Sequence, residues 1–250
     1  AVNFRQSLAT WTEDIVRREL GSFTRLRNTD GSWTPPRPVK GSSPHGPIQL
    51  RDGNLFYLTA VFSDTRDNEP LDFSMDTFVG TKIAALVSED FGETWRESGR
   101  FPSPEPPLTR FCEPFAIELE DGAILAQVRS SDFSIWQSYS DDRGTTWSKP
   151  VPITEGSPPH LMRHSSGLLI GSYGYRSPGY GQRIMFSPND GRTWDTGWII
   201  REDGPNSDLG YPSTVELEDG SLFTVYYQPL SGQSNCAIQG SAWRLPDIYR

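Results

Sequence analysis

Short apolar runs alternate with polar turn segments along most of the chain, and one arrangement occurs four times. In each copy a segment ends in Asp-Gly or Ser-Gly and is followed by an apolar run such as SLFTVYY. The copies are PIQLRDG (47–53), AIELEDG (116–122), LMRHSSG (161–167) and TVELEDG (214–220). A strand, a glycine-containing turn and a second strand are typical of a β-hairpin. We therefore predict four β-hairpins at these positions.

A second repeated phrase, of the form S-x-D-x-G-x-T-W, alternates with the hairpins. Its copies are VSEDFGETW (87–95), YSDDRGTTW (139–147), FSPNDGRTW (186–194) and a degraded NTDGSW (28–33). The Asp or Asn side chain can accept hydrogen bonds from its own turn, and the glycine can adopt a positive φ. The Thr and Trp can anchor the loop in the core. We interpret the phrase as a structural turn and not as a catalytic motif.

The spacing of the two phrases predicts the architecture. The serines that open the second phrase are 140 − 88 = 52 and 187 − 140 = 47 residues apart. Two hairpin signals in each period of about 50 residues give about four strands per repeat, which is typical of β-propeller blades. With 23 Gly, 21 Pro and 8 Trp in 250 residues, the composition also favours short strands joined by many turns.

The charge of the chain narrows the classes of partner. The formal net charge of −9 argues against a nucleic-acid partner, because phosphate binding needs a basic surface. An anionic small ligand stays compatible, since a few arginines can dominate a pocket. The sequence has no apolar run near the roughly 20 residues of a membrane span. Its two cysteines, Cys112 and Cys236, could pair, but two buried free thiols are favoured.

The repeated S-x-D-x-G-x-T-W phrase matches the Asp box, so the chain resembles the sialidase superfamily over roughly residues 22–245. The resemblance implies an all-β, sialidase-like β-propeller with four-stranded antiparallel blades. The family fold has six blades, and at about 50 residues each this chain supplies about five. We expect residues 1–250 to form a single propeller domain, in which residues 1–40 are a weak or incomplete first blade. The segment TEDIVRREL (12–20) could instead form a short helix.

The resemblance also carries expectations about partners. It implies a carbohydrate substrate, anionic in character, with no cofactor, and it favours an extracellular or periplasmic location. The sequence gives no indication of the oligomeric state.

Two reactive side chains occupy equivalent places in the hairpin repeat. In a propeller, the first strand of each blade begins near the central axis, so residues there converge on one pocket. Glu113 and Tyr211 each lie nine residues before their hairpin glycine (122 − 113 and 220 − 211). By the resemblance, Tyr211 is the nucleophile and Glu113 its base, because retaining sialidases use a tyrosine nucleophile. A phenol with a pKa near 10 needs such a base.

Arginines are expected beside this pair because a guanidinium group matches a carboxylate bidentately. The resemblance assigns Arg129, sixteen residues after Glu113 (129 − 113), and Arg183, 28 residues before Tyr211 (211 − 183), as substrate carboxylate ligands. Sialidases take a third arginine and an aspartate acid/base from their first blade. Residues 1–45 contain no match for either, so we assign none. Asp208, in SDLGYP, is a candidate substrate-binding residue or a turn cap.

Two histidines lie near the same rim and leave an alternative open. His45 and His160 precede their hairpin glycines by eight and seven residues (53 − 45 and 167 − 160). Some propeller polysaccharide lyases pair His with Tyr to remove a proton next to a uronate carboxylate, and a histidine of near-neutral pKa suits that step. The alternative is a structural role, in which both histidines are buried and bonded to the backbone. Two histidines alone make a poor metal site, so we assign none.

Aromatic residues near the rim have two interpretations. YGYRSPGYG (173–181), with Trp136, could form a sugar-stacking wall or could pack between blades. The leading function is therefore a sialidase-like glycoside hydrolase acting on a terminal acidic sugar. The alternatives are a uronate lyase that uses His45 or His160 with Tyr211, and a non-catalytic glycan-binding propeller. The absence of a match for the aspartate acid/base and for the third arginine favours the non-catalytic glycan-binding propeller.

Overall fold

The computed structural model describes residues 22–61, 82–103, 110–232 and 235–249, together with Thr12 and Ile15. The elements within this part of the chain are β-strands and one 3-10 helix, η2 (Asp247–Tyr249). The all-β prediction is therefore confirmed for the described residues. No helix among them is long and apolar enough to cross a membrane. The helix expected over residues 12–20 lies largely outside the described residues.

The strands form five antiparallel sheets, three of which have four strands. The first contains β3 (Ile48–Gln49), β4 (Leu55–Val61), β5 (Lys82–Ser88) and β6 (Arg96–Arg100). The second contains β7 (Phe111–Glu118), β8 (Ile124–Ser130), β9 (Ser134–Ser140) and β10 (Val151–Glu155). The third contains β11 (Pro159–Arg163), β12 (Leu169–Tyr175), β13 (Gly181–Ser187) and β14 (Asp195–Arg201).

Two smaller sheets complete the described fold. One has three strands, β15 (Gly210–Glu216), β16 (Leu222–Pro229) and β17 (Cys236–Trp243). The other pairs β1 (Ser22–Thr24) with β2 (Arg37–Val39). Four-stranded blades are therefore confirmed for three sheets. The number of blades, the single domain over residues 1–250 and the weak first blade over residues 1–40 stay predictions.

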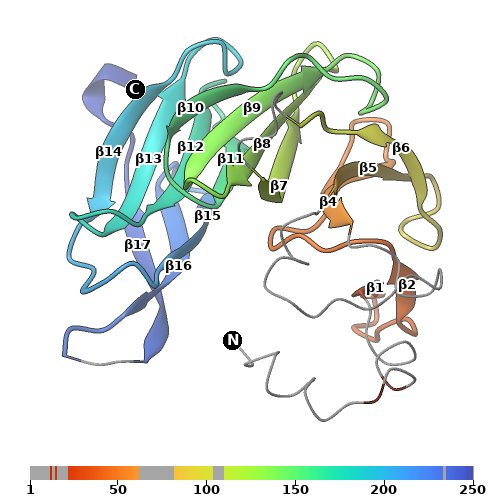
Figure 1. Cartoon of the computed structure of the whole chain (residues 1–250), viewed down its shortest axis with the longest axis horizontal. Coiled ribbons are helices and arrows are strands. Elements are labelled where there is room, and N and C mark those ends of the chain that lie inside the picture. The colour runs from red at the N-terminus through yellow and green to blue at the C-terminus, as the bar shows by residue number, and fades with distance from the viewer. Residues whose placement is uncertain are drawn as a thin grey trace.

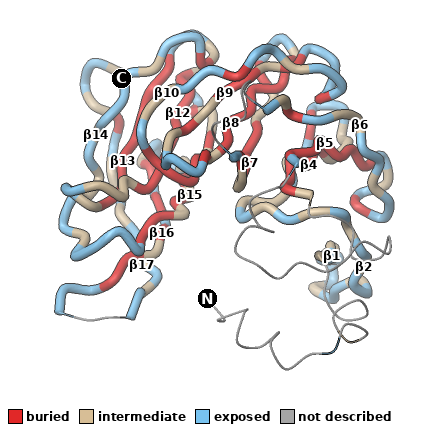
Figure 2. Tube along the Cα trace, viewed as in Figure 1, coloured by how far each residue is buried: buried red, intermediate tan, exposed pale blue. Residues whose placement is uncertain are grey.

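The sheets follow one another along an arc, with β1 and β2 towards one end and β15–β17 at the other (Figure 1). Strand β7 contacts both β4 and β11, and β11 also contacts β15. The first strands of three successive sheets, β7, β11 and β15, are thus neighbours, as expected around a propeller axis, and the first sheet contacts β7 through its second strand, β4. Buried positions concentrate along the strands, whereas turns and outer strands are exposed (Figure 2).

All four predicted hairpins are present. Residues that flank each Asp-Gly or Ser-Gly turn pair across it, as in Glu118 with Ile124 and Glu216 with Leu222. The corresponding pairs in the other two sheets are Gln49 with Leu55 and Arg163 with Leu169.

The Asp boxes join the third and fourth strands of the four-stranded sheets. The same hydrogen-bond pattern occurs in each box. In the second box, the backbone N–H of Gly144 donates to Ser140 Oγ over 2.7 Å, and Ser140 Oγ donates to Asp142. The backbone N–H of Thr146 donates to the same Asp142 carboxylate over 2.8 Å. Asn189 replaces the aspartate in the third box and accepts the equivalent bond from the backbone N–H of Thr193. The structural interpretation of these phrases is confirmed.

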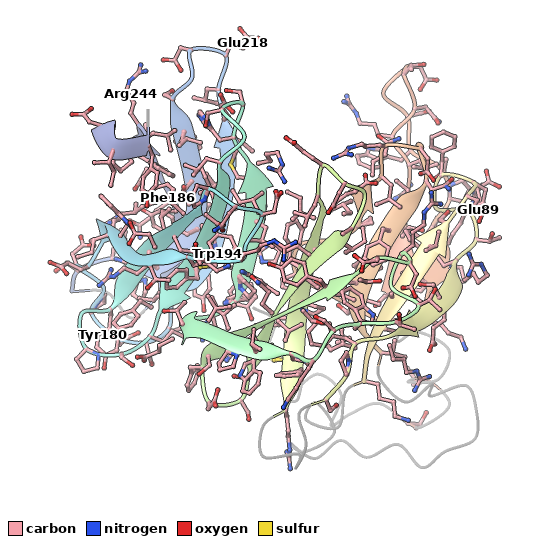
Figure 3. All side chains as sticks on the ribbon, turned by 90° about the horizontal axis from the view of Figure 1, so that it is seen from above. Glu89, Tyr180, Phe186, Trp194, Glu218 and Arg244 are labelled. Atoms are coloured by element: carbon pink, nitrogen blue, oxygen red, sulfur yellow. The ribbon has the colours of Figure 1, made fainter. Side chains whose placement is uncertain are left out.

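The tryptophan that closes an Asp box reaches the core between sheets. Figure 3 shows Trp194 pointing into the protein, whereas Glu89 and Glu218, which lie in turns, are near its edge. The indole N–H of Trp194 donates to Gln137 Oε1 over 2.8 Å. Gln137 in turn donates to the backbone oxygen of Gly191 over 2.9 Å, so this network ties the second sheet to the third.

Because consecutive strands are antiparallel, each four-stranded sheet has two rims, and different connections lie at each of them. The hairpin turns and the Asp boxes share one rim, which we call the turn rim. The starts of β7, β11 and β15, the ends of β8 and β12, and the β8–β9 turn share the other, which we call the site rim.

Candidate active site

Glu113 and Tyr211 are placed at the site rim by the same backbone device. The β7–β8 pairing shifts register between Cys112 and Phe115, and the β15–β16 pairing shifts between Gly210 and Ser213. At these irregularities Glu113 has a φ of 48° and Tyr211 a φ of 52°. A positive φ in a residue other than glycine costs of order 1–3 kcal/mol and is held by the surrounding structure, often at functional sites. A register irregularity also re-aims a side chain that would otherwise follow the strand alternation.

The two side chains meet although they are 98 residues apart in the chain. The Tyr211 hydroxyl donates a hydrogen bond to Glu113 Oε1. The other carboxylate oxygen, Oε2, accepts a 2.7 Å bond from Arg129 Nη1. The side chains of Arg129 and Glu113 are 18% and 23% exposed, so solvent screens this ion pair only in part. The sequence therefore identified three residues that the fold brings into one cluster.

Arg176 belongs to the same cluster, and the sequence analysis did not assign it. Its guanidinium carbon lies 5.8 Å from the centre of the Tyr211 ring, and its Nη2 donates to the Tyr227 hydroxyl over 3.4 Å. Its Nε is buried and has no hydrogen-bond partner among the described residues. A buried donor without a partner is a feature that a ligand can satisfy.

A sequence signal for Arg176 exists. Arg129 follows its hairpin glycine by seven residues (129 − 122), and Arg176 follows its glycine, Gly167, by nine (176 − 167). Both spacings are odd, and alternate residues of a strand share a face. A search for arginines on that face near the end of the second strand would have found both.

Asp208 lies beside the cluster but contacts a different tyrosine. The Tyr227 hydroxyl donates to Asp208 Oδ1 over 2.9 Å, and the Tyr227 ring lies 5.7 Å from the Tyr211 ring. Burial raises the pKa of Tyr227 to about 12, with Arg176 opposing the shift and the Asp208 hydrogen bond adding to it. Asp208 thus holds the neighbour of Tyr211.

The structure does not bring Arg183 to Glu113 or Tyr211. Its Nη1 donates to the backbone oxygen of Arg201 over 2.6 Å, and its Nη2 to that of Gly179 over 2.7 Å. Its guanidinium carbon lies 4.9 Å from the centre of the Tyr175 ring. The physical reason is its strand: β13 is the third strand of its sheet, so its side chain meets the carbonyls of the preceding loop and of β14.

His45 and His160 form an aromatic cluster with Phe115. The His160 ring stacks on Phe115 with centroids 4.8 Å apart, and the two histidine rings are 5.3 Å apart. His160 Nδ1 accepts a 3.4 Å bond from the backbone N–H of Thr214. Burial lowers the pKa of His45 to about 4, although the Glu113 charge opposes the shift. Burial and the nearby His45 lower that of His160 to about 3. Both rings are therefore neutral at neutral pH.

The loop residues near the rim have varied surroundings. Tyr173 is fully buried, and Tyr175 faces the Arg183 guanidinium. Trp136 packs on Phe111 with ring centroids 5.6 Å apart, beside the core of the first two sheets. Among these aromatic residues, Tyr173 and Trp136 therefore match the packing interpretation.

The electrostatics favour a protonated Tyr211 in the free protein. Burial raises the pKa of its phenol, the Glu113 charge and hydrogen bond add to this, and Arg129 and Arg176 oppose it. The phenol therefore needs a base at the moment of attack, and Glu113 already accepts its hydrogen bond. The adjacent Cys112 thiol is also neutral, because burial and the Glu113 charge raise its pKa to about 11. Cys112 and Cys236 are both free.

Nothing within the described residues suggests a metal site. No group of three or more His, Cys, Asp or Glu side chains there has a metal-binding arrangement. The cluster instead offers a phenol, a carboxylate that accepts its proton and two guanidinium groups. This combination suits nucleophilic chemistry on a substrate that carries a negative charge.

Comparisons with known proteins agree with the fold. A family described as "BNR repeat-like domain" matches residues 3–224. A sialidase of Clostridium perfringens is 25% identical over 242 residues, which cover 78% of this chain and 58% of that protein. The chain thus spans little more than half the length of this relative.

Solved structures extend the likeness. A Dyadobacter fermentans protein of unknown function has a TM-score of 0.73 at 24% identity, covering 91% of this chain and 65% of that one. The NanB sialidase of Streptococcus pneumoniae (K499G mutant) has a TM-score of 0.64 at 18% identity, covering 89% and 35%. An α-L-arabinanase of Penicillium chrysogenum complexed with arabinobiose has a TM-score of 0.59 at 19% identity, covering 88% and 67%. The fold is that of the sialidase-like β-propellers.

Proposed function

This chain belongs to the BNR repeat-like domain family, and from this premise we propose that it is a glycoside hydrolase that removes a terminal acidic sugar. Sialic acid is the preferred candidate substrate. The observation that carries the proposal is the hydrogen bond from Tyr211 to Glu113, with Arg129 on the other carboxylate oxygen. The sialidase of Clostridium perfringens among its relatives supports the same class of substrate.

In the proposed reaction, the Tyr211 oxygen attacks the anomeric carbon while Glu113 takes the phenolic proton. A phenol suits this substrate because the anomeric carbon of sialic acid carries a carboxylate, which would repel a carboxylate nucleophile. The glycosidic bond breaks towards the leaving oxygen, and water then hydrolyses the tyrosyl–sugar bond. The proton donor for the leaving oxygen is not assigned to a described residue.

Arg129 and Arg176 are the proposed ligands of the substrate carboxylate. Arg129 uses Nη1 for Glu113, which leaves its other donors for the substrate. Arg176 has a buried Nε without a partner in the described part of the chain. Arg183, which the resemblance suggested for this role, is not included because backbone carbonyls already occupy its two Nη groups.

The lyase alternative receives less support from the site. A histidine with a pKa of about 4 is a weak base, and the ring of His160 is held on Phe115. Non-catalytic glycan binding remains the second candidate, because no described residue is assigned as the acid. An aryl leaving group separates the two, since it departs without protonation.

The decisive experiment is release of the fluorophore from an aryl sialoside. We expect turnover by the wild-type chain, and Tyr211→Phe and Glu113→Gln should lower kcat by roughly 10²–10⁴-fold. Tyr249→Phe is the matched control, because the Tyr249 hydroxyl bonds Asp195 in the third sheet. Unchanged turnover in Tyr211→Phe would exclude it as the nucleophile.

The identity of the substrate needs a second comparison. Cleavage of an aryl arabinofuranoside but not of the sialoside would contradict the acidic-sugar proposal. New unsaturated-uronate absorbance would indicate the lyase. Binding of sialic acid without turnover would indicate the glycan-binding protein.

A further inference from the structure

The described residues other than glycine adopt a positive φ in only a few places. Three such residues occupy the same Asp-box position, directly before the box glycine: Phe91, Arg143 and Asp190. Two others are Glu113 and Tyr211 at their bulges. The sixth is Phe133, with a φ of 64°, which is the last residue of the three-residue loop between β8 and β9, where such a hairpin places a left-handed residue. The four predicted hairpins have a glycine at the equivalent position, as in Gly122, so the presence of a bulky phenylalanine here calls for an explanation.

The turn that holds Phe133 is fixed from several sides. Phe133 lies between β8 and β9 at the site rim, and its N–H donates to the backbone oxygen of Ser130 over 3.0 Å. Its own backbone oxygen accepts a 2.7 Å bond from the N–H of Gly156, which precedes β11. Ser130 Oγ also accepts a 3.1 Å bond from the N–H of Ser134. The backbone of the turn is therefore held by bonds within the loop and by the Gly156 bond, which continues the pairing of β9 with β10.

The Phe133 ring lies against a residue of the candidate site. The guanidinium carbon of Arg129 lies 5.4 Å from the centre of the ring. Phe133 is nevertheless 43% exposed, so burial of the ring does not explain the strained conformation. A guanidinium group is attracted to the face of an aromatic ring within about 6 Å.

We infer that Phe133 is a positioning residue, which holds the Arg129 guanidinium in the orientation required to bind an anionic substrate group. Glu113 fixes Arg129 through Nη1 alone, and a single bond leaves the guanidinium plane free to rotate. The Phe133 ring supplies the second constraint. The part of this inference that concerns substrate rests on the proposed function, whereas the restraint of Arg129 does not.

The kinetic test uses variants that separate the ring from its volume. With the aryl sialoside, Phe133→Leu should raise KM about 3–10-fold with little change in kcat, and Phe133→Tyr should restore the wild-type value, because it keeps an aromatic face. Phe91→Leu is the matched control. Phe91 has a φ of 57° and is 61% exposed, but it lies in an Asp box at the turn rim. Equal KM values for Phe133→Leu and the wild type would overturn the inference.

A second measurement needs no substrate. A restrained guanidinium group gives a resolved ¹⁵N–¹H side-chain signal, and the Arg129 signal is identified by its loss in Arg129→Lys. We expect Phe133→Leu to broaden this signal or merge it with those of exposed arginines, whereas Phe91→Leu leaves it unchanged. An unaltered Arg129 signal in Phe133→Leu would overturn the inference. If the wild type cleaves no sialoside, the proposed function fails and this signal alone decides the role of Phe133.

The strain itself is measured by a third pair of variants. Phe133→Gly and Phe133→Ala both remove the ring, but only the alanine retains a Cβ at positive φ. Phe133→Gly should therefore have a Tm about 2–4 °C above that of Phe133→Ala. A lower Tm for Phe133→Gly would show that the turn holds no strain to be explained.

Discussion

The two rims of the sheets both hold non-glycine residues in the left-handed conformation, but their surroundings differ. At the turn rim, Phe91, Arg143 and Asp190 occupy one position of a repeated turn, and the same serine–glycine bond lies beside each. At the site rim, Glu113 and Tyr211 occupy register irregularities in two different sheets, and their side chains contact each other. The positive φ at the turn rim is part of the turn that repeats. At Glu113 and Tyr211 it aims two side chains from different sheets at one point, which points to function.

The two rims also differ in the sequence separation of their hydrogen-bonded residues. Within each Asp box, the Ser, the Asp or Asn, the Gly and the Thr are bonded to one another over at most four residues, as in Thr94 to Asp90, so these bonds form wherever the phrase is present. The bonds of the site rim join distant residues, as in Tyr211 to Glu113. Substitutions at the turn rim should therefore change stability, and substitutions at the site rim should change activity.

The largest effect is expected at Arg176, compared with a second arginine from the same end of the third sheet. Arg176→Met should lower kcat/KM for an aryl sialoside by about 10–100-fold, because it removes a proposed carboxylate ligand. Arg183→Met is the comparison, since its guanidinium contacts backbone carbonyls and not the cluster. It should destabilise the protein and leave kcat/KM within about 3-fold of the wild type. The reverse result would return Arg183 to the site.

The next effect concerns the histidines behind the site rim. Between an unfolded pKa of about 6.5 and the folded value of about 4, His45 binds a proton more readily when unfolded. Stability must therefore fall as the pH drops through this range. We expect His45 to contribute a loss of about 2 kcal/mol in the free energy of unfolding between pH 8 and pH 5.

Urea unfolding of the wild type and His45→Gln at both pH values measures this loss. The variant should lose less stability on acidification, and His160 should account for part of what remains. An identical pH dependence in the two proteins would show that the pKa of His45 is the same in the folded and the unfolded protein.

The smallest effect tests the turn rim. Ser140→Ala removes the acceptor of the Gly144 N–H and leaves that donor unpaired, so it should reduce the free energy of unfolding by about 1–2 kcal/mol. Ser88→Ala and Ser187→Ala should give similar losses, because the same bond is present in their boxes. Activity should not change in any of them. A selective loss of activity in one variant would contradict the separation of the rims.

The predictability of the site varied with the range of the interactions. The nine-residue spacing identified Glu113 and Tyr211, and in the other two repeats the same position holds Pro44 and Pro158. Arg129 was found from the sixteen-residue spacing after Glu113 that the resemblance supplies, and in the structure it pairs with Cys112, next to Glu113, on the adjacent strand of the same hairpin. Arg183 contacts backbone carbonyls away from the cluster because it lies on the third strand of its sheet. Arg176 was missed although its odd spacing from Gly167 places it on the same face as Arg129.

By itself, the sequence determined the hairpins, the Asp boxes and the all-β class, because each depends on residues a few positions apart whose turn chemistry is local. Only the tertiary structure decided which guanidinium groups stand beside Tyr211, and that the two histidines are neutral. Those properties arise from packing between sheets, where side chains distant in the chain exclude water from one another.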